Sequence, residues 1–284
     1  MSEPRAEYVV SRAAARPYVE LVGAAKTYSR SGNKSKSGTR ALEAIDLTVH
    51  EGEFLAIVGP SGCGKSTLLR MVAGLHPATS GTVRVAGLTV AAPQTGLGIV
   101  FQSPVLLDWR TALDNVLIQV ELRGLDPRGY RERAIKLLRN VGLADFIDAY
   151  PAELSGGMRQ RVAIVRALIH DAPLLLMDEP FGALDALTRE QMRVDLEALW
   201  LATRKTVVFI THSIDEAVLL ADRVVVMSPR PGRIERTIVI DLARPRGLEA
   251  RRAPEFLDAA QMITDIFLAR GVLHGAASLA GSMG

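Results

Sequence analysis

The chain has 284 residues, of which 48% are hydrophobic and 23% charged, as in ordinary globular proteins with a sizeable core. This composition excludes collagen, coiled coils and wholly disordered chains. The net charge of +3 is too small to indicate nucleic-acid binding by itself. A single cysteine excludes an intrachain disulfide and a cysteine-rich metal site.

Neither a membrane span nor a secretory signal is expected. The sequence has no uninterrupted run of roughly 18 apolar residues. Its N-terminus has no long apolar segment followed by a cleavage site. We therefore expect the chain to stay on the side of the membrane where it is made and to reach any membrane through partners.

The first part of the chain predicts strands around a glycine-rich turn. Strands are expected over 18–28 and 41–50, arranged like a hairpin and joined by the basic, Gly/Ser-rich loop Ser29–Arg40. A short apolar strand is expected over 51–59, and a helix over 65–75. The order strand, glycine loop, helix predicts a parallel α/β sheet.

The rest of the chain alternates helices and strands. Residues 110–141 are rich in helical patterns and predict a helical insertion between two parts of the sheet. Further strands are expected over 173–179, 206–212 and 222–228.

Three helical features complete the second half. In the helix expected over 190–204, Met192, Leu196, Leu199 and Trp200 share one face, which predicts core packing. Ser213 and Glu216 have the spacing of a capping box. A last helix is expected over 255–271, most simply as a packing element, before a Gly/Ala/Ser-rich end expected to be disordered.

One glycine-rich segment matches the pattern G-x-x-x-x-G-K-[ST], which is typical of phosphate-binding loops. Its residues are Gly59, Pro60, Ser61, Gly62, Cys63, Gly64, Lys65 and Ser66. Such glycines let backbone N–H groups turn around phosphate oxygens, and the following helix presents its positive N-terminus to the same anion. Lys65 supplies a mobile positive charge, and the Ser66 hydroxyl suits Mg²⁺. Cys63 is expected to serve as a spacer side chain in the loop. Its position beside the helix N-terminus could lower the pKa of its thiol.

Acidic and amide side chains follow the later strands. Asp178 and Glu179 end the strand LLLMDE, where the carboxyl ends of parallel strands gather ligands. Asp178 is placed to hold the Mg²⁺ hydration shell, and Glu179 to orient or deprotonate a water. His212 ends the strand TVVFITH, and Gln102 begins the insertion. Each of these last two is weak evidence alone.

A second anion-binding pattern precedes a strong helix. Ser155, Gly156 and Gly157 again place backbone N–H groups at a helix N-terminus, within LSGGMRQR. The segment has no lysine or metal ligand of its own. It forms either a second nucleotide site or half of a site completed by another subunit, and the residues alone leave both alternatives open.

Taken together, these motifs resemble those of the ATP-binding cassette (ABC) ATPases in order and spacing over about residues 18–232. The resemblance implies a P-loop NTPase of the α/β class: a parallel-sheet RecA-like core, an antiparallel β subdomain and a helical insertion. It also implies ATP and Mg²⁺ as cofactors. The implied domains are a flexible tail (1–17), the ATPase domain (18–240, with the helical subdomain at about 103–165) and a C-terminal helix with a disordered tail (241–284).

The resemblance assigns a role to each matching residue. Tyr28 resembles the aromatic residue that stacks on adenine, and Thr67 completes the phosphate loop GPSGCGKST. Gln102 resembles the residue that links Mg²⁺ and water to the transport partner, and His212 the switch that contacts the γ-phosphate. Ser155, Gly156 and Gly157 resemble the signature that caps the γ-phosphate held by the opposite subunit, and Asp185 the residue that communicates across the dimer. Catalysis is thereby expected of Glu179, His212, Lys65 and Gln102, and metal binding of Ser66, Gln102 and Asp178.

Two features depart from the family pattern. Met158 stands where the signature usually has glutamine, so it cannot supply that amide. The loop Ser29–Arg40 lengthens the spacing between Tyr28 and the phosphate loop, which weakens the adenine assignment.

The segments LLDWRTALDNV and MDEPFGALDALTREQM further resemble the nitrate/sulfonate/taurine importer branch. This resemblance implies a homodimer on the cytoplasmic side of the inner membrane, bound peripherally to an integral-membrane permease and served indirectly by a solute-binding protein. The segment 103–116 is expected to contact the permease, although its apolar residues would serve equally well in a core. No nucleic acid is expected. The alternatives are a soluble cassette acting on nucleic acid or ribosomes, and a small-molecule kinase.

Overall fold

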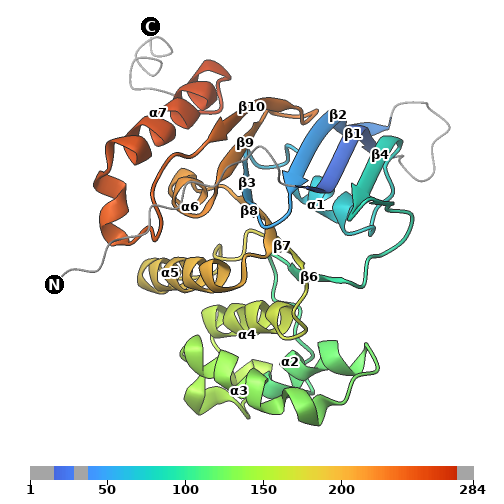
Figure 1. The fold of residues 1–284 in the computed structure, drawn as a ribbon, viewed down its shortest axis with the longest axis vertical. Helices are drawn as coiled ribbons and strands as arrows, with labels where there is room; N and C mark the ends of the chain where they lie inside the picture. The colour runs from blue at the N-terminus through green and yellow to red at the C-terminus, as the bar shows by residue number, and fades with distance from the viewer. Residues whose placement is uncertain (1–15, 29–37, 274–284) are drawn as a thin grey trace, which may run out of the picture.

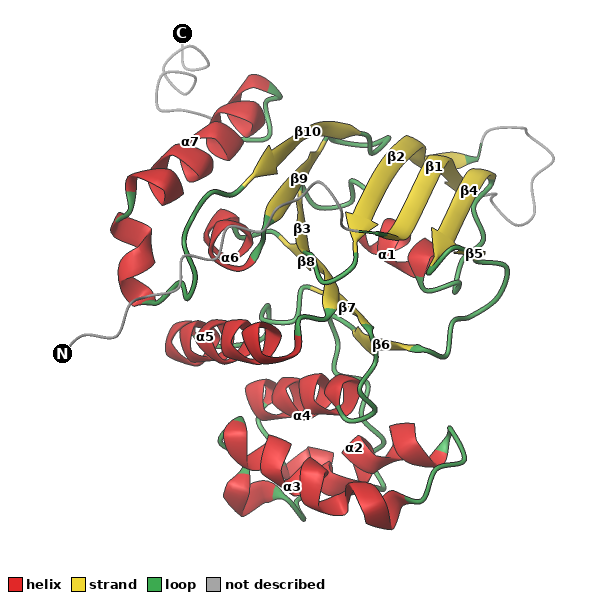
Figure 2. Ribbon diagram, viewed as in Figure 1, coloured by secondary structure: helices red, strands yellow, loops and turns green. Residues whose placement is uncertain are grey.

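The computed structural model describes residues 16–28 and 38–273, and within them two β-sheets and a lobe of helices meet (Figures 1 and 2). The predictions for residues 1–15, most of the loop Ser29–Arg40, and the end of the chain beyond residue 273 lie outside these ranges. No described helix is both long and apolar enough to cross a bilayer.

The smaller sheet is antiparallel, with the strand order β2-β1-β4-β5. β1 and β2 pair antiparallel, which confirms the predicted hairpin-like arrangement. The short β4 and β5 were not predicted, because they are largely exposed and carry little apolar pattern. The bounds are β1 (Pro17–Tyr28), β2 (Thr39–His50), β4 (Ser80–Val85) and β5 (Leu88–Thr89).

The larger sheet has six strands in the order β10-β9-β3-β8-β7-β6. Five of them are parallel, as predicted, but β10 runs antiparallel to β9 at one edge. β6 and β10, at the two edges, were not predicted. The bounds are β3 (Phe54–Val58), β6 (Leu97–Val100), β7 (Leu174–Asp178), β8 (Thr206–Thr211), β9 (Arg223–Met227) and β10 (Ile234–Val239).

Seven α-helices complete the described chain, and three of them, α2, α3 and α4, lie between β6 and β7, where the helical insertion was predicted. Figure 1 shows this helical lobe beneath the sheet and α7 on the side away from the antiparallel sheet. The bounds are α1 (Lys65–Val72), α2 (Ala112–Glu121), α3 (Arg131–Asn140), α4 (Gly156–Leu168), α5 (Ala186–Thr203), α6 (Ile214–Leu220) and α7 (Pro254–Ala269).

The large sheet separates two hydrophobic cores, because side chains alternate between its faces. In β3, Leu55 and Ile57 join the core that contains α1 and the antiparallel sheet. Phe54 and Ala56 of the same strand join the core covered by α5, α6 and α7. The C-terminal helix α7 buries Phe256, Ala259, Ile263 and Phe267 there, which confirms its predicted packing role.

Trp200 on α5 anchors the chain that leads to α7. Its ring is 3% exposed and lies between two guanidinium groups, 4.5 Å from that of Arg204 and 4.3 Å from that of Arg244. The indole Nε1 donates a hydrogen bond of 2.8 Å to the carbonyl of Lys205. The predicted apolar stripe is therefore core at Met192, Leu196 and Trp200, while Leu199 is only partly buried.

Helix α4 belongs to two cores at once. Ile164, Ala167 and Leu168 pack into the core of the large sheet. Val162 and Val165 pack instead with α2 and α3, in the third hydrophobic cluster of the described chain. One helix therefore forms the wall between the sheet and the helical lobe.

Candidate functional site

The predicted phosphate loop connects the end of β3 to the first turn of α1. Gly64 precedes the helix with φ of 106°, in the region that favours glycine, and a Cβ there would lie 2.6 Å from Leu42 Cδ2. Lys65 is only 6% exposed, and its ammonium donates to the carbonyls of Gly59 (2.7 Å) and Pro60 (3.1 Å). The lysine side chain therefore folds back along the inner side of the loop.

The loop lies against the end of β7. Ser66 Oγ donates a hydrogen bond of 3.0 Å to Asp178 Oδ1. Asp178 is 4% exposed, and its burial raises the pKa of the carboxyl above its ordinary value of 3.8, opposed by the Ser66 hydrogen bond. Two of the three residues predicted to bind metal, Ser66 and Asp178, are thus in direct contact.

This pair suits Mg²⁺ by the chemistry of its donors. A hydroxyl and a carboxylate are hard oxygen ligands, and Mg²⁺ typically takes one or two such protein ligands together with phosphate oxygens and water. Over the described ranges no group of three or more His, Cys, Asp or Glu side chains could hold a metal alone. The donor set therefore fits a metal that arrives with a phosphate ligand.

Glu179 lies in contact with two other predicted site residues, Gln102 and His212. Gln102 Nε2 donates to Glu179 Oε2 across 3.0 Å. His212 Nδ1 lies 3.5 Å from the same oxygen. Glu179 has φ of 48°, an unusual backbone conformation for a non-glycine residue. The carboxylate is thus held between an amide and an imidazole, as a group that orients a water requires.

Strand order explains why these residues meet. Three adjacent parallel strands, β6, β7 and β8, lead at their carboxyl ends to Gln102, Asp178 and His212 respectively. The phosphate loop follows β3, which lies beside β8. All four strands end at one edge, where ligands of open α/β sheets bind. The prediction that Asp178 and Glu179 lie beside the phosphate loop agrees with the contact between Ser66 and Asp178, while the functional roles of these residues stay predictions.

Tyr28 lies beside the phosphate loop. Its hydroxyl is 3.3 Å from Thr67 Oγ1 in the first turn of α1. The Lys26 ammonium lies 5.3 Å from the ring centroid, and His76 meets the ring edge-on at 5.8 Å. The structure thus brings Tyr28 to the loop, while its stacking on adenine stays a prediction.

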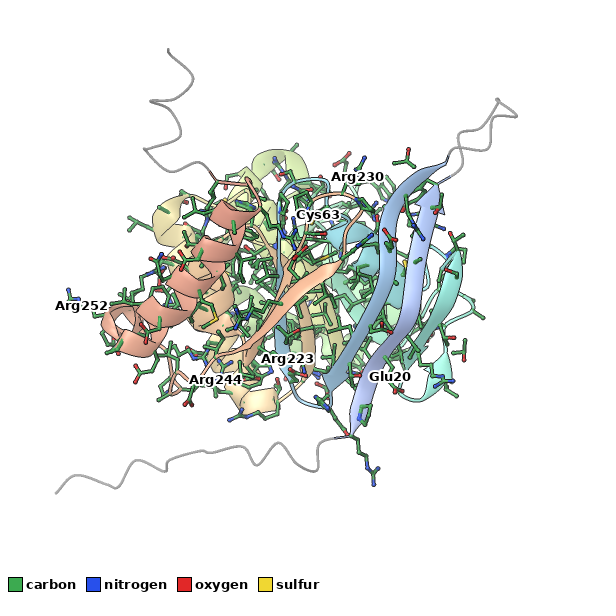
Figure 3. The ribbon with its side chains drawn as sticks, turned by 90° about the horizontal axis from the view of Figure 1, so that it is seen from above. Glu20, Cys63, Arg223, Arg230, Arg244 and Arg252 are labelled. Carbon is green, nitrogen blue, oxygen red and sulfur yellow. The ribbon has the colours of Figure 1, made fainter. Side chains whose placement is uncertain are left out.

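The suggestion that the helix N-terminus lowers the thiol pKa of Cys63 is wrong. Cys63 is 1% exposed, and this burial raises the pKa of the thiol, outweighing the charge of Lys65. Arg230 donates from Nε to the carbonyl of Gly62 at 3.1 Å, and Figure 3 shows Arg230 and Cys63 at the same end of the molecule. No sequence motif pointed to Arg230, because the contact spans 168 residues.

The signature segment forms the N-terminus of α4. Ser155 is the N-cap residue, and its Oγ accepts a hydrogen bond of 3.2 Å from the backbone N–H of Met158. Gly156 and Gly157 form the first turn. Figure 1 shows α4 away from α1, so the signature and the phosphate loop of one chain are separate. Met158 packs its apolar side chain against the cluster of α2 and α3.

Asp185 caps α5 in the same manner. Its carboxylate accepts a hydrogen bond of 3.0 Å from the N–H of Thr188, and these hydrogen bonds lower the pKa of Asp185. The predicted capping box of α6 forms only in part. Ser213 accepts from the N–H of Glu216, but the Glu216 carboxylate accepts from Thr211 Oγ1 instead of reaching back to the N–H of Ser213.

The segment 103–116 divides between surface and core. Val105 and Trp109 are 63% and 74% exposed, whereas Leu113 and Val116 are buried in the helical lobe. Beside it runs a groove of about 650 Å³, bounded by β6, α2 and α4. The segment is therefore partly core and partly surface, and its contact with a permease stays a prediction.

Sequence reasoning missed two residues of α4, Gln160 and Arg166. Gln160 is fully buried and donates from Nε2 to the carbonyl of Phe101, next to Gln102. A signal existed for Gln160: it shares the helical spacing of the buried Ile164 and Ala167, where a polar residue needs an explanation. Arg166 left no such signal.

Comparisons with known proteins agree with this geometry. The family model described as ABC transporter matches residues 42–182. The uncharacterised ABC transporter ATP-binding protein MJ0412 of Methanocaldococcus jannaschii is 49% identical over 85% of this chain and 88% of its own length. The taurine import ATP-binding protein TauB of Rhizobium johnstonii is 44% identical over 84% of this chain and 91% of its own length.

A solved structure extends the similarity to three dimensions. The ATP-binding cassette MJ0796, a dimer in a post-hydrolysis state bound to ADP and Pi, superposes with a TM-score of 0.70 at 34% identity. The match covers 78% of this chain and 98% of the cassette. A P-loop fold of this kind, with a relative 44% identical over most of both chains, establishes the family. The chain belongs to the ABC transporter ATP-binding proteins, the ATPases of the ATP-binding cassette family.

Proposed function

We propose that two copies of this chain hydrolyse ATP to power an importer of a small solute. The expected solute is taurine or a related sulfonate, and nitrate is the alternative. The observation that supports the chemistry best is the convergence at one sheet edge of the Ser66–Asp178 pair with Glu179, Gln102 and His212. The observation that supports the solute is the name of several relatives, taurine import ATP-binding protein, at 44–49% identity.

The site residues act on ATP by positioning and charge. The N–H groups of the phosphate loop and the Lys65 ammonium bind the phosphates, after Lys65 leaves the carbonyls it contacts here. Mg²⁺, held by Ser66 and Asp178, would supply positive charge against the phosphate oxygens. Glu179 accepts a proton from the attacking water, with Gln102 and His212 keeping its carboxylate in place.

A homodimer supplies what one chain lacks. Ser155, Gly156 and Gly157 expose an anion-binding helix N-terminus that faces no phosphate loop of its own chain. The dimeric cassette MJ0796 supports an arrangement in which each signature meets the nucleotide of the opposite copy. Asp185, exposed at the N-terminus of α5, is then available to the partner copy.

The groove beside the segment 103–116 is the proposed contact for a membrane permease. Val105 and Leu122 expose apolar surface along it, and its lining includes Phe101, the residue before Gln102. Bound to the integral-membrane permease there, this chain would lie peripherally on the cytoplasmic side of the inner membrane, and a solute-binding protein would act on the opposite side. The taurine-import relatives favour this function over a nucleic-acid or ribosome-bound cassette and over a small-molecule kinase.

Reconstitution tests the proposal. The chain, co-purified with the permease encoded beside it and placed in proteoliposomes with the solute-binding protein, should hydrolyse ATP faster when taurine is added and should accumulate radiolabelled taurine. Lys65→Ala serves as the matched control, since it removes the phosphate-binding charge and should abolish both signals. Uptake of nitrate without taurine would reassign the solute, while a chain that binds no membrane permease and drives no uptake would contradict the importer.

A further inference from the structure

Two side chains of α4 hold the short segment that carries Gln102. Gln160 donates from Nε2 to the carbonyl of Phe101 at 3.2 Å, immediately before Gln102. Arg166 donates from Nη1 to the carbonyl of Val105 and from Nη2 to that of Pro104, each at 2.7 Å. The segment 101–105 is thus tied to one helix on both sides of Gln102.

The Arg166 contact is a specific one. A guanidinium presents its donors in a fixed planar fork, so a single arginine can hold two successive carbonyls in one set geometry, whereas a lysine ammonium is a point charge on a flexible stem. Both acceptors are neutral, which means that the charge of Arg166 is used to hold backbone and not to pair with an acid. Burial lowers the pKa of Arg166, in agreement with a desolvated cation.

The held backbone has an unusual conformation. Val105 has φ of 45°, and β-branched residues rarely adopt positive φ. A conformation of this kind persists where surrounding contacts impose it, and the Arg166 contact to the Val105 carbonyl is such a contact. Without it, we expect the segment to relax and Gln102 to shift.

A shift of Gln102 would reach the hydrolytic carboxylate directly, because Gln102 Nε2 lies 3.0 Å from Glu179 Oε2. Phe101, Val105 and Arg166 also line the groove of about 650 Å³. The same contact thus lies between the groove and Glu179.

We propose that Arg166 is a positioning residue for ATP hydrolysis: its fork on the Pro104 and Val105 carbonyls, with Gln160 on the Phe101 carbonyl, holds Gln102 against Glu179. The inference rests on the proposed roles of Gln102 and Glu179.

The test measures both turnover and the mobility of the segment in the full-length chain. Steady-state hydrolysis of MgATP is compared for the wild type, Arg166→Gln and Arg166→Lys. Arg133→Gln is the matched control, because Arg133 donates to the carbonyl of Leu168 at the same C-terminal end of α4 and not to the segment 101–105. Mobility is read by electron paramagnetic resonance from a spin label on Val105→Cys, since Val105 is 63% exposed while the native Cys63 is 1% exposed and escapes labelling.

Arg166→Gln should lower kcat by about tenfold to a hundredfold, the range expected for a misplaced catalytic group, and leave the KM for ATP within about twofold. The spin label should become more mobile in this variant. Arg166→Lys should give an intermediate kcat, because it keeps the charge but not the fork, and Arg133→Gln should match the wild type. Should Arg166→Gln not fold, the Lys variant carries the same comparison.

The inference would be overturned if the Arg166 variants turned over ATP at the wild-type rate and the spin label kept its wild-type mobility. It would also be overturned if kcat and KM changed together while the mobility of the label did not change. Gln102→Ala separates this failure from that of the site itself. Normal turnover of Gln102→Ala would remove Gln102 from catalysis and the inference with it. Slow turnover of Gln102→Ala beside normal Arg166 variants would overturn only the role of Arg166.

Discussion

Gln102 donates a hydrogen bond of 3.0 Å to Glu179, and this bond joins the end of β6 to the end of β7. The two residues lie 77 positions apart in the chain, with the whole helical lobe inserted between them. Any movement of that lobe against the sheet therefore acts on the carboxylate proposed to activate water.

The substitution Glu179→Gln should stop turnover while leaving ATP binding intact. The amide keeps the size of the side chain but cannot accept a proton from water, so the nucleotide-bound pair of chains should persist. Size-exclusion chromatography with MgATP should show a dimer for this variant and a monomer for Glu179→Gln combined with Lys65→Ala. Normal hydrolysis by Glu179→Gln would mean that another group is the base.

The substitution Asp178→Asn should stabilise the free chain but abolish hydrolysis. The raised pKa of Asp178, caused chiefly by burial, means that the folded state favours the protonated carboxyl. Its ionised form therefore costs stability as pH rises above the ordinary value of 3.8, and an amide avoids this cost.

Thermal unfolding without nucleotide should show the Asn variant more stable by roughly 1–2 kcal/mol at neutral pH. The difference should vanish once the pH falls below 3.8, where the carboxyl is protonated in both the folded and the unfolded state. Equal stability of the two proteins at pH 7 would contradict the burial argument.

His170 should make the chain less stable in mild acid. Burial lowers the pKa of its imidazole from 6.5 to about 4, with the charge of Arg123 next in importance. Both ring nitrogens are buried without a hydrogen-bond partner among the described residues. The folded state thus favours neutral imidazole, and the stability present above pH 6.5 is lost as the pH falls towards 4.

Chemical denaturation of the wild type and of His170→Gln at several pH values measures this effect. Between pH 7 and pH 4 the wild type should lose roughly 1–2 kcal/mol more free energy of unfolding than the variant, a figure reduced because the side chain is only half-buried. Parallel pH profiles for the two proteins would show that His170 is ionised in the folded state as freely as in the unfolded one.

Replacing Trp200 by Phe should destabilise the fold. The smaller ring loses the hydrogen bond to the Lys205 carbonyl and leaves a space between Arg204 and Arg244, at a cost of about 2–3 kcal/mol. Trp109→Phe is the matched control, since Trp109 is 74% exposed and should not affect the melting temperature. Equal melting temperatures for the two variants would mean that the contacts of Trp200 with Lys205, Arg204 and Arg244 contribute little to the stability of the fold.

Most residues of the candidate site could be predicted from the sequence, because they follow strands in recognisable motifs. The phosphate loop, Asp178, Glu179 and His212 each end a strand, and parallel strands bring their carboxyl ends together. Gln102 was weaker evidence, because β6 is only four residues long and was not predicted.

Contacts that depend on tertiary packing could not be predicted from the sequence. The Arg166 fork joins residues 61 and 62 positions apart, and Arg230 reaches Gly62 across 168 residues. Cys63 illustrates the same point in its chemistry. A helix N-terminus favours the thiolate, but how deeply the thiol is buried depends on the whole fold, and here burial prevails.

Helix α4 has a consequence for how the molecule comes apart. Its two faces cover separate clusters, so melting α4 with the helical lobe would also expose the apolar side of the sheet against which Ile164 and Leu168 pack. Hydrogen exchange along α4 should therefore follow global opening and not local fraying, and a calorimeter should record one peak for both parts. A single shared helix makes the two regions one cooperative unit.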